Sequence, residues 1–176
     1  MQPEQSGRSH YIKCRGNITV DGQIENYGTL YVGTFDTANN TWNSETGSIT
    51  VNSYYTSGDY KYSVRNYENI YMAGDLTMVA TFFGYGACDG DKGVYVFGDV
   101  IACNDNIEKK NLVELKKECK FYVHGCVTSD GSTANKRIWL RGENQDDSTA
   151  DCPKTVFSVF GAGRGEADCF KNKLEG

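Results

Sequence analysis

A short unit that recurs along the chain constrains the fold more than any other feature of the sequence. The unit consists of an apolar residue, any residue, a second apolar residue, any residue and glycine, and often continues with one more residue and a further apolar one. The copy that begins at Ile49 has Ser53 in place of the glycine. The copies begin at Ile18, Ile49, Ile70, Val94, Phe121, Ile138 and Phe157.

The unit has the alternation of a short β-strand that ends at a corner. Side chains at the first, third, fifth and seventh positions of a strand point to the same side, so the apolar residues face inward together. Threonine or tyrosine at the second position then faces outward. Glycine at the fifth position removes an inward side chain, so the backbone can bend there or approach a neighbour closely.

The spacing of the copies predicts a parallel β-solenoid. They recur about every 23 residues, which suits one coil that stacks on the coil before it. We therefore expect an all-β, single-domain parallel β-helix of about seven coils over residues 11–163. A polar leader, residues 1–10, precedes it, and a charged C-terminal tail or cap, residues 164–176, follows. The uneven spacing then reflects long loops at 34–47 and 104–118.

An antiparallel β-sandwich is the alternative architecture. Short alternating strands with glycine at turns are also typical of sandwiches and barrels. The segment Leu30–Gly33 favours this alternative, because its glycine comes one position early in the unit. Similar layouts at 16–32 and 98–115 would fit two transthyretin-like modules.

Two stretches carry a resemblance to known families. Ile24-Glu25-Asn26-Tyr27-Gly28-Thr29-Leu30-Tyr31-Val32 and Val64-Arg65-Asn66-Tyr67-Glu68-Asn69-Ile70 resemble the repeats of β-helical surface adhesins. The unit with glycine at the fifth position is also similar to that of bactofilin-like polymer-forming proteins. The resemblance extends over about residues 12–161 and implies a non-enzymatic structural repeat protein.

Composition and charge exclude several classes of function. The chain of 176 residues is rich in tyrosine and glycine, as a strand-rich fold requires, and has a formal net charge of −5. It has no clustered basic run of the kind that binds phosphate backbones, so we expect no nucleic-acid partner. It also lacks an apolar stretch of about 18 residues, so we expect no membrane span.

The cysteines favour an oxidising compartment. The chain has 7 cysteines and 2 histidines, and no Cys-x-x-Cys pair of the kind that binds zinc. Scattered cysteines without metal spacing predict disulfides, and we pair Cys88 with Cys103 and Cys152 with Cys169. An extracellular or cell-surface location follows, and the polar start of the chain leaves a cytoplasmic one open.

The sequence contains no recognisable catalytic site, and we expect no cofactor and no bound metal. His124 and Cys126 lie close in sequence, but a disulfide or an unreactive surface pair explains them. The segment Asp89-Gly90-Asp91 is typical of a turn. Asp75 and Asp99 occupy the sixth position of successive units and would form an acidic strip, as in carbohydrate-binding or carbohydrate-cleaving β-helices.

Outward aromatic residues are the strongest candidates for contacts. Tyr71, Tyr95, Tyr122 and Trp139 share the second position of their units and would stack into a ladder on the outer surface. Such a ladder serves an interface or stabilises the sheet itself. We expect a structural or adhesive protein that self-associates or binds a surface protein or glycan. A glycan-binding or glycan-cleaving β-helix and a secreted β-sandwich binding module are the alternatives.

Overall fold

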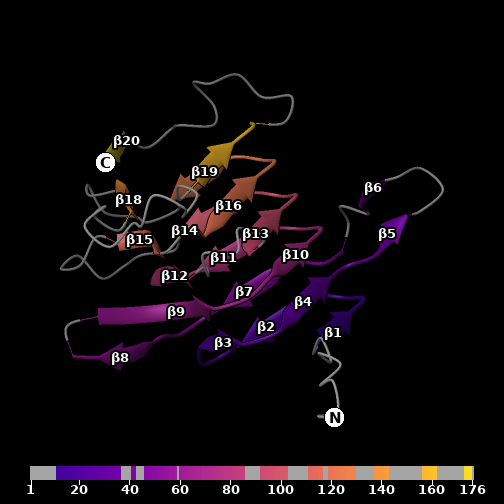
Figure 1. Cartoon of the computed structure of the whole chain (residues 1–176), viewed down its shortest axis with the longest axis horizontal. Coiled ribbons are helices and arrows are strands. Elements are labelled where there is room, and N and C mark those ends of the chain that lie inside the picture. Colours follow the sequence, from indigo (N-terminus) through magenta and orange to yellow (C-terminus); the bar gives the residue numbers. More distant parts are fainter. Residues whose placement is uncertain are drawn as a thin grey trace, which may run out of the picture.

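A computed structural model describes residues 11–36, 41–42, 46–58, 60–85, 92–102, 111–116, 119–129, 137–142, 156–161 and 173–175. All described elements are β-strands, arranged in three sheets of parallel strands and one small antiparallel pair (Figure 1). No helix in this part of the chain is long and apolar enough to cross a membrane. Parallel pairing of the main strands rules out the antiparallel sandwich as an architecture for the described residues.

The chain visits the three sheets in rotation, and we call one visit to sheets A, B and C a pass. Sheet A contains β1 (Tyr11–Cys14), β4 (Thr29–Val32), β10 (Ile70–Met72), β13 (Gly93–Val96), β16 (Lys120–Val123) and β19 (Val156–Val159). Sheet B contains β2 (Ile18–Val20), β7 (Ile49–Val51), β11 (Leu76–Met78), β14 (Val100–Ala102) and β17 (Val127–Ser129). Within each of these two sheets, strands of successive passes pair in parallel.

Sheet C completes each pass and carries the longer strands. It contains β3 (Ile24–Asn26), β9 (Tyr60–Asn66), β12 (Thr81–Tyr85), β15 (Asn111–Lys116), β18 (Arg137–Gly142) and β20 (Lys173–Glu175). A short strand, β8 (Tyr55–Ser57), pairs antiparallel with the beginning of β9. β20 lies in the segment that the sequence assigns to a charged tail, and it pairs with β18 at the edge of this sheet.

The seven sequence units are distributed over all three sheets. The units at Ile70, Val94, Phe121 and Phe157 form strands of sheet A, whereas those at Ile18 and Ile49 belong to sheet B and that at Ile138 to sheet C. One unit therefore does not mark one coil, and the number of units does not give the number of coils. Sheet A itself has six described strands, one for each pass.

The early glycine at Leu30–Gly33 has a simple structural reason. Gly33 and Gly47 both adopt positive φ, 102° and 97°, which favours glycine. The chain leaves sheet A at Gly33, forms an antiparallel hairpin of β5 (Phe35–Asp36) and β6 (Thr41–Trp42), and returns at Gly47. Gly74 of the next pass donates its N–H to the Gly47 carbonyl at 3.2 Å. The unit is therefore intact but interrupted by an excursion.

The inward side chains of the three sheets form one hydrophobic core. Val94 and Val96 of sheet A, Val100 of sheet B and Val113 of sheet C are fully or almost fully buried within it. Phe82 and Phe121 meet edge-on across this core, with ring centroids 4.9 Å apart. The predicted inward direction of the first and third unit positions is therefore confirmed in these strands.

The corner between sheets A and B has no room for a side chain at the fifth unit position. A Cβ atom at Gly98 would overlap Asp75 Oδ1, and one at Gly125 would overlap Asp99 Oδ1. Consecutive corner glycines are joined directly, because Gly98 donates to the Gly74 carbonyl at 3.1 Å and Gly125 to the Gly98 carbonyl at 3.0 Å. The predicted close approach at these glycines is confirmed.

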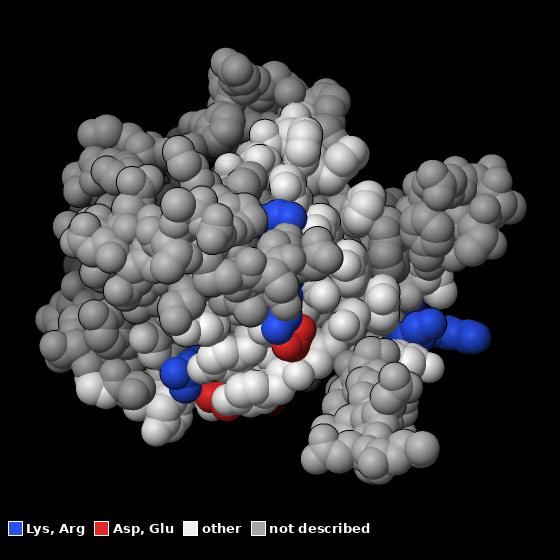
Figure 2. Space-filling model, in the orientation of Figure 1, with Lys and Arg blue, Asp and Glu red and all other residues white. Residues whose placement is uncertain are grey.

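Charged side chains are sparse on the described surface in the view of Figure 2, where a group of basic side chains lies at the right, near β1. The structure thus presents a largely uncharged band over the sheet A strands. Among the described residues, this band contains no long run of basic side chains.

A single added methyl group should have different effects at Gly98, where a Cβ has no room, and at Gly22, where it has room. Gly98→Ala should lower the free energy of unfolding by about 1–3 kcal/mol, because the new Cβ overlaps a carboxylate and the Gly74 backbone. Gly22→Ala is the matched control, since its Cβ would meet nothing closer than 3.9 Å. Urea denaturation of both variants measures the difference, and equal stabilities would contradict the packing of this corner.

Candidate functional site

A ladder of polar side chains follows the corner between sheets A and B, and we call it the corner ladder. Asn17 Oδ1 accepts the Ser48 N–H at 3.0 Å, and Ser48 Oγ accepts the Asp75 N–H at 3.0 Å. Asp75 Oδ1 accepts the Asp99 N–H at 2.7 Å, and Asp99 Oδ1 accepts the Cys126 N–H at 2.9 Å. Each side chain therefore bonds the backbone of the next pass.

The predicted acidic strip is part of this ladder. Asp75 and Asp99 do follow one another in successive passes, as the sequence indicates. Repulsion between the two carboxylates is offset because each accepts a backbone N–H, and a hydrogen bond to a charged acceptor is among the stronger ones. The geometry gives these carboxylates a structural role in joining passes, whereas a sugar-cleaving pair would line a groove.

The predicted aromatic ladder is present with one different member. Tyr31, Tyr71, Tyr95 and Tyr122 lie in register in sheet A. Their rings are stacked, with centroids 5.2, 4.9 and 5.2 Å apart from one pair to the next. We call these four residues the tyrosine column.

Trp139 does not belong to the tyrosine column, so this part of the prediction is wrong. It lies in β18 of sheet C and pairs with Asn111 and Glu175. Its unit resembles those of sheet A in pattern, but the apolar alternation is the same in every sheet and does not say which sheet a strand joins. The sixth strand of sheet A instead has Ser158 opposite Tyr122.

Stacking determines what the tyrosine column offers to a partner. Because the rings cover one another's faces, the inner members present their edges to the outside. Beyond Tyr31, the ammonium of Lys13 lies 5.5 Å from the ring centroid. The column therefore has few open ring faces for stacking on sugars, and the contacts between its rings stabilise sheet A.

A second tyrosine cluster, which the repeated unit does not predict, lies where sheet C meets sheet A. Tyr27 and Tyr67 stack with centroids 4.7 Å apart, and Tyr67 lies 6.0 Å from Tyr85. Arg65 forms an ion pair with Glu25 at 3.2 Å and also lies over the Tyr67 ring. The shared Asn-Tyr in the two adhesin-like stretches is the sequence signal for this cluster.

Those two stretches are in fact paired in the structure. Asn26 lies opposite Asn66, and its Nδ2 donates to Asn66 Oδ1 at 2.7 Å. Asn66 is fully buried and donates onward to the Glu68 carbonyl at 2.6 Å.

Burial lowers the pKa of Arg65, but Tyr67 and Glu25 more than offset this effect, so the pKa of Arg65 lies above its ordinary value.

The cysteine and histidine residues form no catalytic pair in the described part of the chain. His124 is exposed while Cys126 is fully buried, so the two side chains do not project from one surface. Cys14 and Cys119 carry free thiols. No group of three or more metal-ligating side chains gathers among the described residues.

Four predicted disulfide partners and one predicted turn lie outside the described residues: Cys88, Cys103, Cys152, Cys169 and Asp89-Gly90-Asp91.

Comparisons with protein-family models, with curated proteins and with solved structures find no match for this chain. Its function is therefore inferred from its own residues and their geometry.

The corner ladder predicts a specific pattern of substitution effects. Asp99→Ala should cost about 1–3 kcal/mol of stability, because the buried Cys126 loses the acceptor of its N–H. Asp99→Asn keeps an oxygen in place and should cost less than about 1 kcal/mol. Thermal unfolding followed by circular dichroism measures both.

Asp21→Ala serves as the control, because Asp21 accepts a hydrogen bond only from the exposed side chain of Asn52 in the described contacts. It should change stability by no more than about 0.5 kcal/mol. An Asp99→Ala variant as stable as this control would show that the corner ladder does not hold the passes together.

The two free thiols should differ in reactivity. Burial raises the pKa of Cys119 to about 12, from an ordinary value of 9.0, so its thiol stays protonated at pH 8.5. The raised pKa stabilises the fold below pH 9, and this contribution is lost as the pH rises toward 12. Iodoacetamide at pH 8.5 should label half-buried Cys14 in the native protein and Cys119 only after unfolding, as read by peptide mass spectrometry. Equal native labelling of both would contradict the burial.

Proposed function

We propose that this protein is a non-enzymatic structural β-solenoid that self-associates. In this proposal the three sheets close around the common core, and each pass forms one coil of the solenoid. The regular rotation of the chain through sheets A, B and C supports the closure, as does the single core cluster that draws on all three sheets. The six described strands of sheet A would correspond to six coils.

One observation carries the structural role: side chains able to perform chemistry are used to join one pass to the next. Asp75 and Asp99 bond backbone N–H groups, and the tyrosine column covers its own ring faces. Parallel ladders of this kind give rigidity along the direction of stacking. The pattern-level resemblance to surface adhesins and to bactofilin-like proteins agrees with this role.

An extracellular or cell-surface location is part of the proposal. Cys126 is disulfide-bonded and fully buried beside the corner ladder, which supports an oxidising compartment. In a reducing cytoplasm this bond would be rare. At such a location the protein would work in contact with other copies of itself or with surface proteins.

Exposed apolar groups support self-association. Ile12 lies opposite the buried Leu30, yet 66% of its own surface is exposed, because no described strand continues the stack beyond β1. A strand edge with unpaired backbone groups is a template for further strands. Phe160, at the other described end of sheet A, is 65% exposed.

Light scattering after size-exclusion chromatography tests the proposal. The chain has a mass of 19.5 kDa, and we expect a larger mass that increases with protein concentration. A single species of monomer mass at every concentration, from about 1 μM to about 1 mM (the range in which weak protein contacts form), would contradict self-association. The same run with reductant separates disulfide-linked species from non-covalent ones.

A further inference from the structure

The outer face of sheet A carries a second line of aromatic rings beside the tyrosine column. Phe97, His124 and Phe160 each follow a sheet A strand and stack in successive passes through backbone hydrogen bonds, such as His124 N–H to the Val96 carbonyl at 2.8 Å. Their ring centroids are 5.8 and 6.3 Å apart. We call these three residues the aromatic row.

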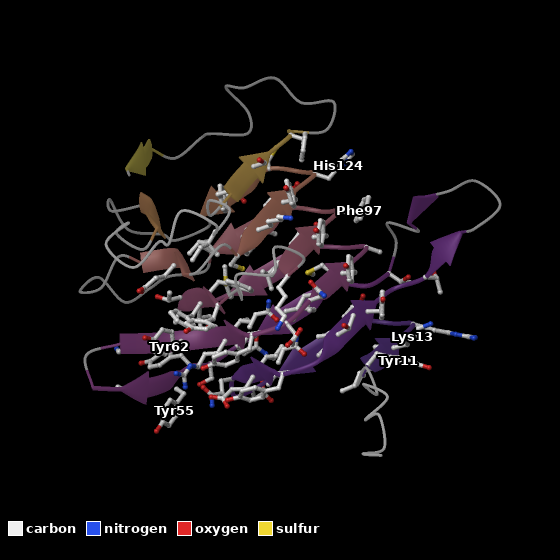
Figure 3. The ribbon with its side chains drawn as sticks, in the orientation of Figure 1. Tyr11, Lys13, Tyr55, Tyr62, Phe97 and His124 are labelled. Carbon is white, nitrogen blue, oxygen red and sulfur yellow. The ribbon has the colours of Figure 1, made fainter. Side chains whose placement is uncertain are left out.

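The aromatic row is exposed and continuous with the tyrosine column. Phe97 is 40% and Phe160 65% exposed, and His124 is exposed as well. The Phe160 ring lies 6.5 Å from that of Tyr122, which joins row and column into one surface. Figure 3 shows Phe97 and His124 one after the other along the right-hand ends of the strands, with Lys13 further down on the same side. Exposed aromatic rings gathered on one face are typical of interaction sites.

The charges of this face lie mainly at one end. Its described outward positions, counting the residue after each strand, include no acidic residue, and the basic ones are Lys13, Arg15 and Lys120. Lys13 and Arg15 belong to the first pass. In Figure 2 the described surface over the right-hand ends of β10, β13 and β16 is white. A partner must therefore be uncharged over most of its length and avoid a cation opposite the first pass.

A second copy of the same face meets these requirements. We propose that two copies dock through sheet A, face to face, with their passes running in opposite order; this inference rests on the self-association proposed above. A two-fold axis along the strands places the first pass of one copy opposite the sixth pass of the other. Lys13 then lies opposite Ser158, and Arg15 lies opposite the exposed ring of Phe160, where a guanidinium is attracted to an aromatic face.

Ring geometry favours this partner over a sugar. The tyrosine column presents ring edges to the outside because its faces are covered. Sugars stack on open ring faces, which the inner members of the column do not offer. In the opposite order of passes the column of one copy lies opposite the column of the other, and the exposed Phe160 lies opposite Arg15. Equal order of passes would instead bring the two Lys13 side chains together, which costs affinity.

The double variant Phe97→Ser/Phe160→Ser tests the surface. It should raise the dissociation constant of the dimer about tenfold or more, because exposed aromatic anchors contribute much of the binding energy of an interface. Sedimentation equilibrium measures this constant. Tyr27→Ser is the matched control, since Tyr27 is 66% exposed but lies outside sheet A. It should leave the dissociation constant within about twofold. Circular dichroism checks that each variant is folded, and Phe160→Ser alone repeats the test if the double variant is not.

Ser158 tests the relative direction of the two copies. Ser158→Glu should tighten the dimer, because the new carboxylate would face Lys13 of the second copy, and Ser158→Lys should weaken it. Equal effects of both, or the reverse order, would overturn the antiparallel arrangement. If the wild-type protein is monomeric, self-association itself fails. If it associates but the Phe97→Ser/Phe160→Ser variant associates as well as Tyr27→Ser does, only the assignment to sheet A fails.

Discussion

The close approach of successive passes at the corner between sheets A and B is the constraint on which the rest of the structure depends. Asp99 shows it most fully: its N–H donates to Asp75 Oδ1, its carbonyl accepts the Leu76 N–H at 2.8 Å, and its carboxylate accepts the Cys126 N–H. These three bonds fix the position of one pass on its neighbours. They leave no space for a side chain at Gly98 or Gly125, which is why the unit requires glycine there.

Fixing this corner also fixes what faces outward from sheet A. Because the passes are held in register, residues at equal positions of the unit form columns. The rings of Tyr71, Tyr95 and Tyr122 therefore stack on one another. The same register produces the aromatic row beside them. The proposed structural and self-associating role rests on this arrangement, because the regular stack repeats its outward residues from pass to pass.

Much of the fold could be predicted from the sequence because the unit states two physical requirements at once. In Val94–Gly98, alternation gives the inward valines and glycine gives the corner, and both are confirmed. Alternation does not say which of three sheets a strand joins, so it wrongly places Trp139 with the tyrosines. The excursion after Gly33 also resembled a broken unit, because the residue that completes the corner, Gly47, lies far along the chain.

The candidate site was harder to predict than the fold. The unit correctly predicts Asp75 and Asp99 in successive passes, but their hydrogen-bond partners are backbone groups, which carry no sequence signal. The contact of Tyr27 with Tyr67 depends on β3 pairing with β9, across about 40 residues and the hairpin excursion (contacts of such separation leave little local pattern). Sequence periodicity therefore predicts columns within one sheet better than contacts between distant corners.

Amide hydrogen exchange measured by NMR tests the central claim most directly. The N–H groups of Asp75, Asp99 and Cys126 lie at a corner outside any strand, where exchange would be fast without the corner ladder. The structure predicts that these three amides are protected as strongly as those of the neighbouring sheet A strands. Exchange at the rate of unprotected loop amides would show that successive passes are not joined at this corner.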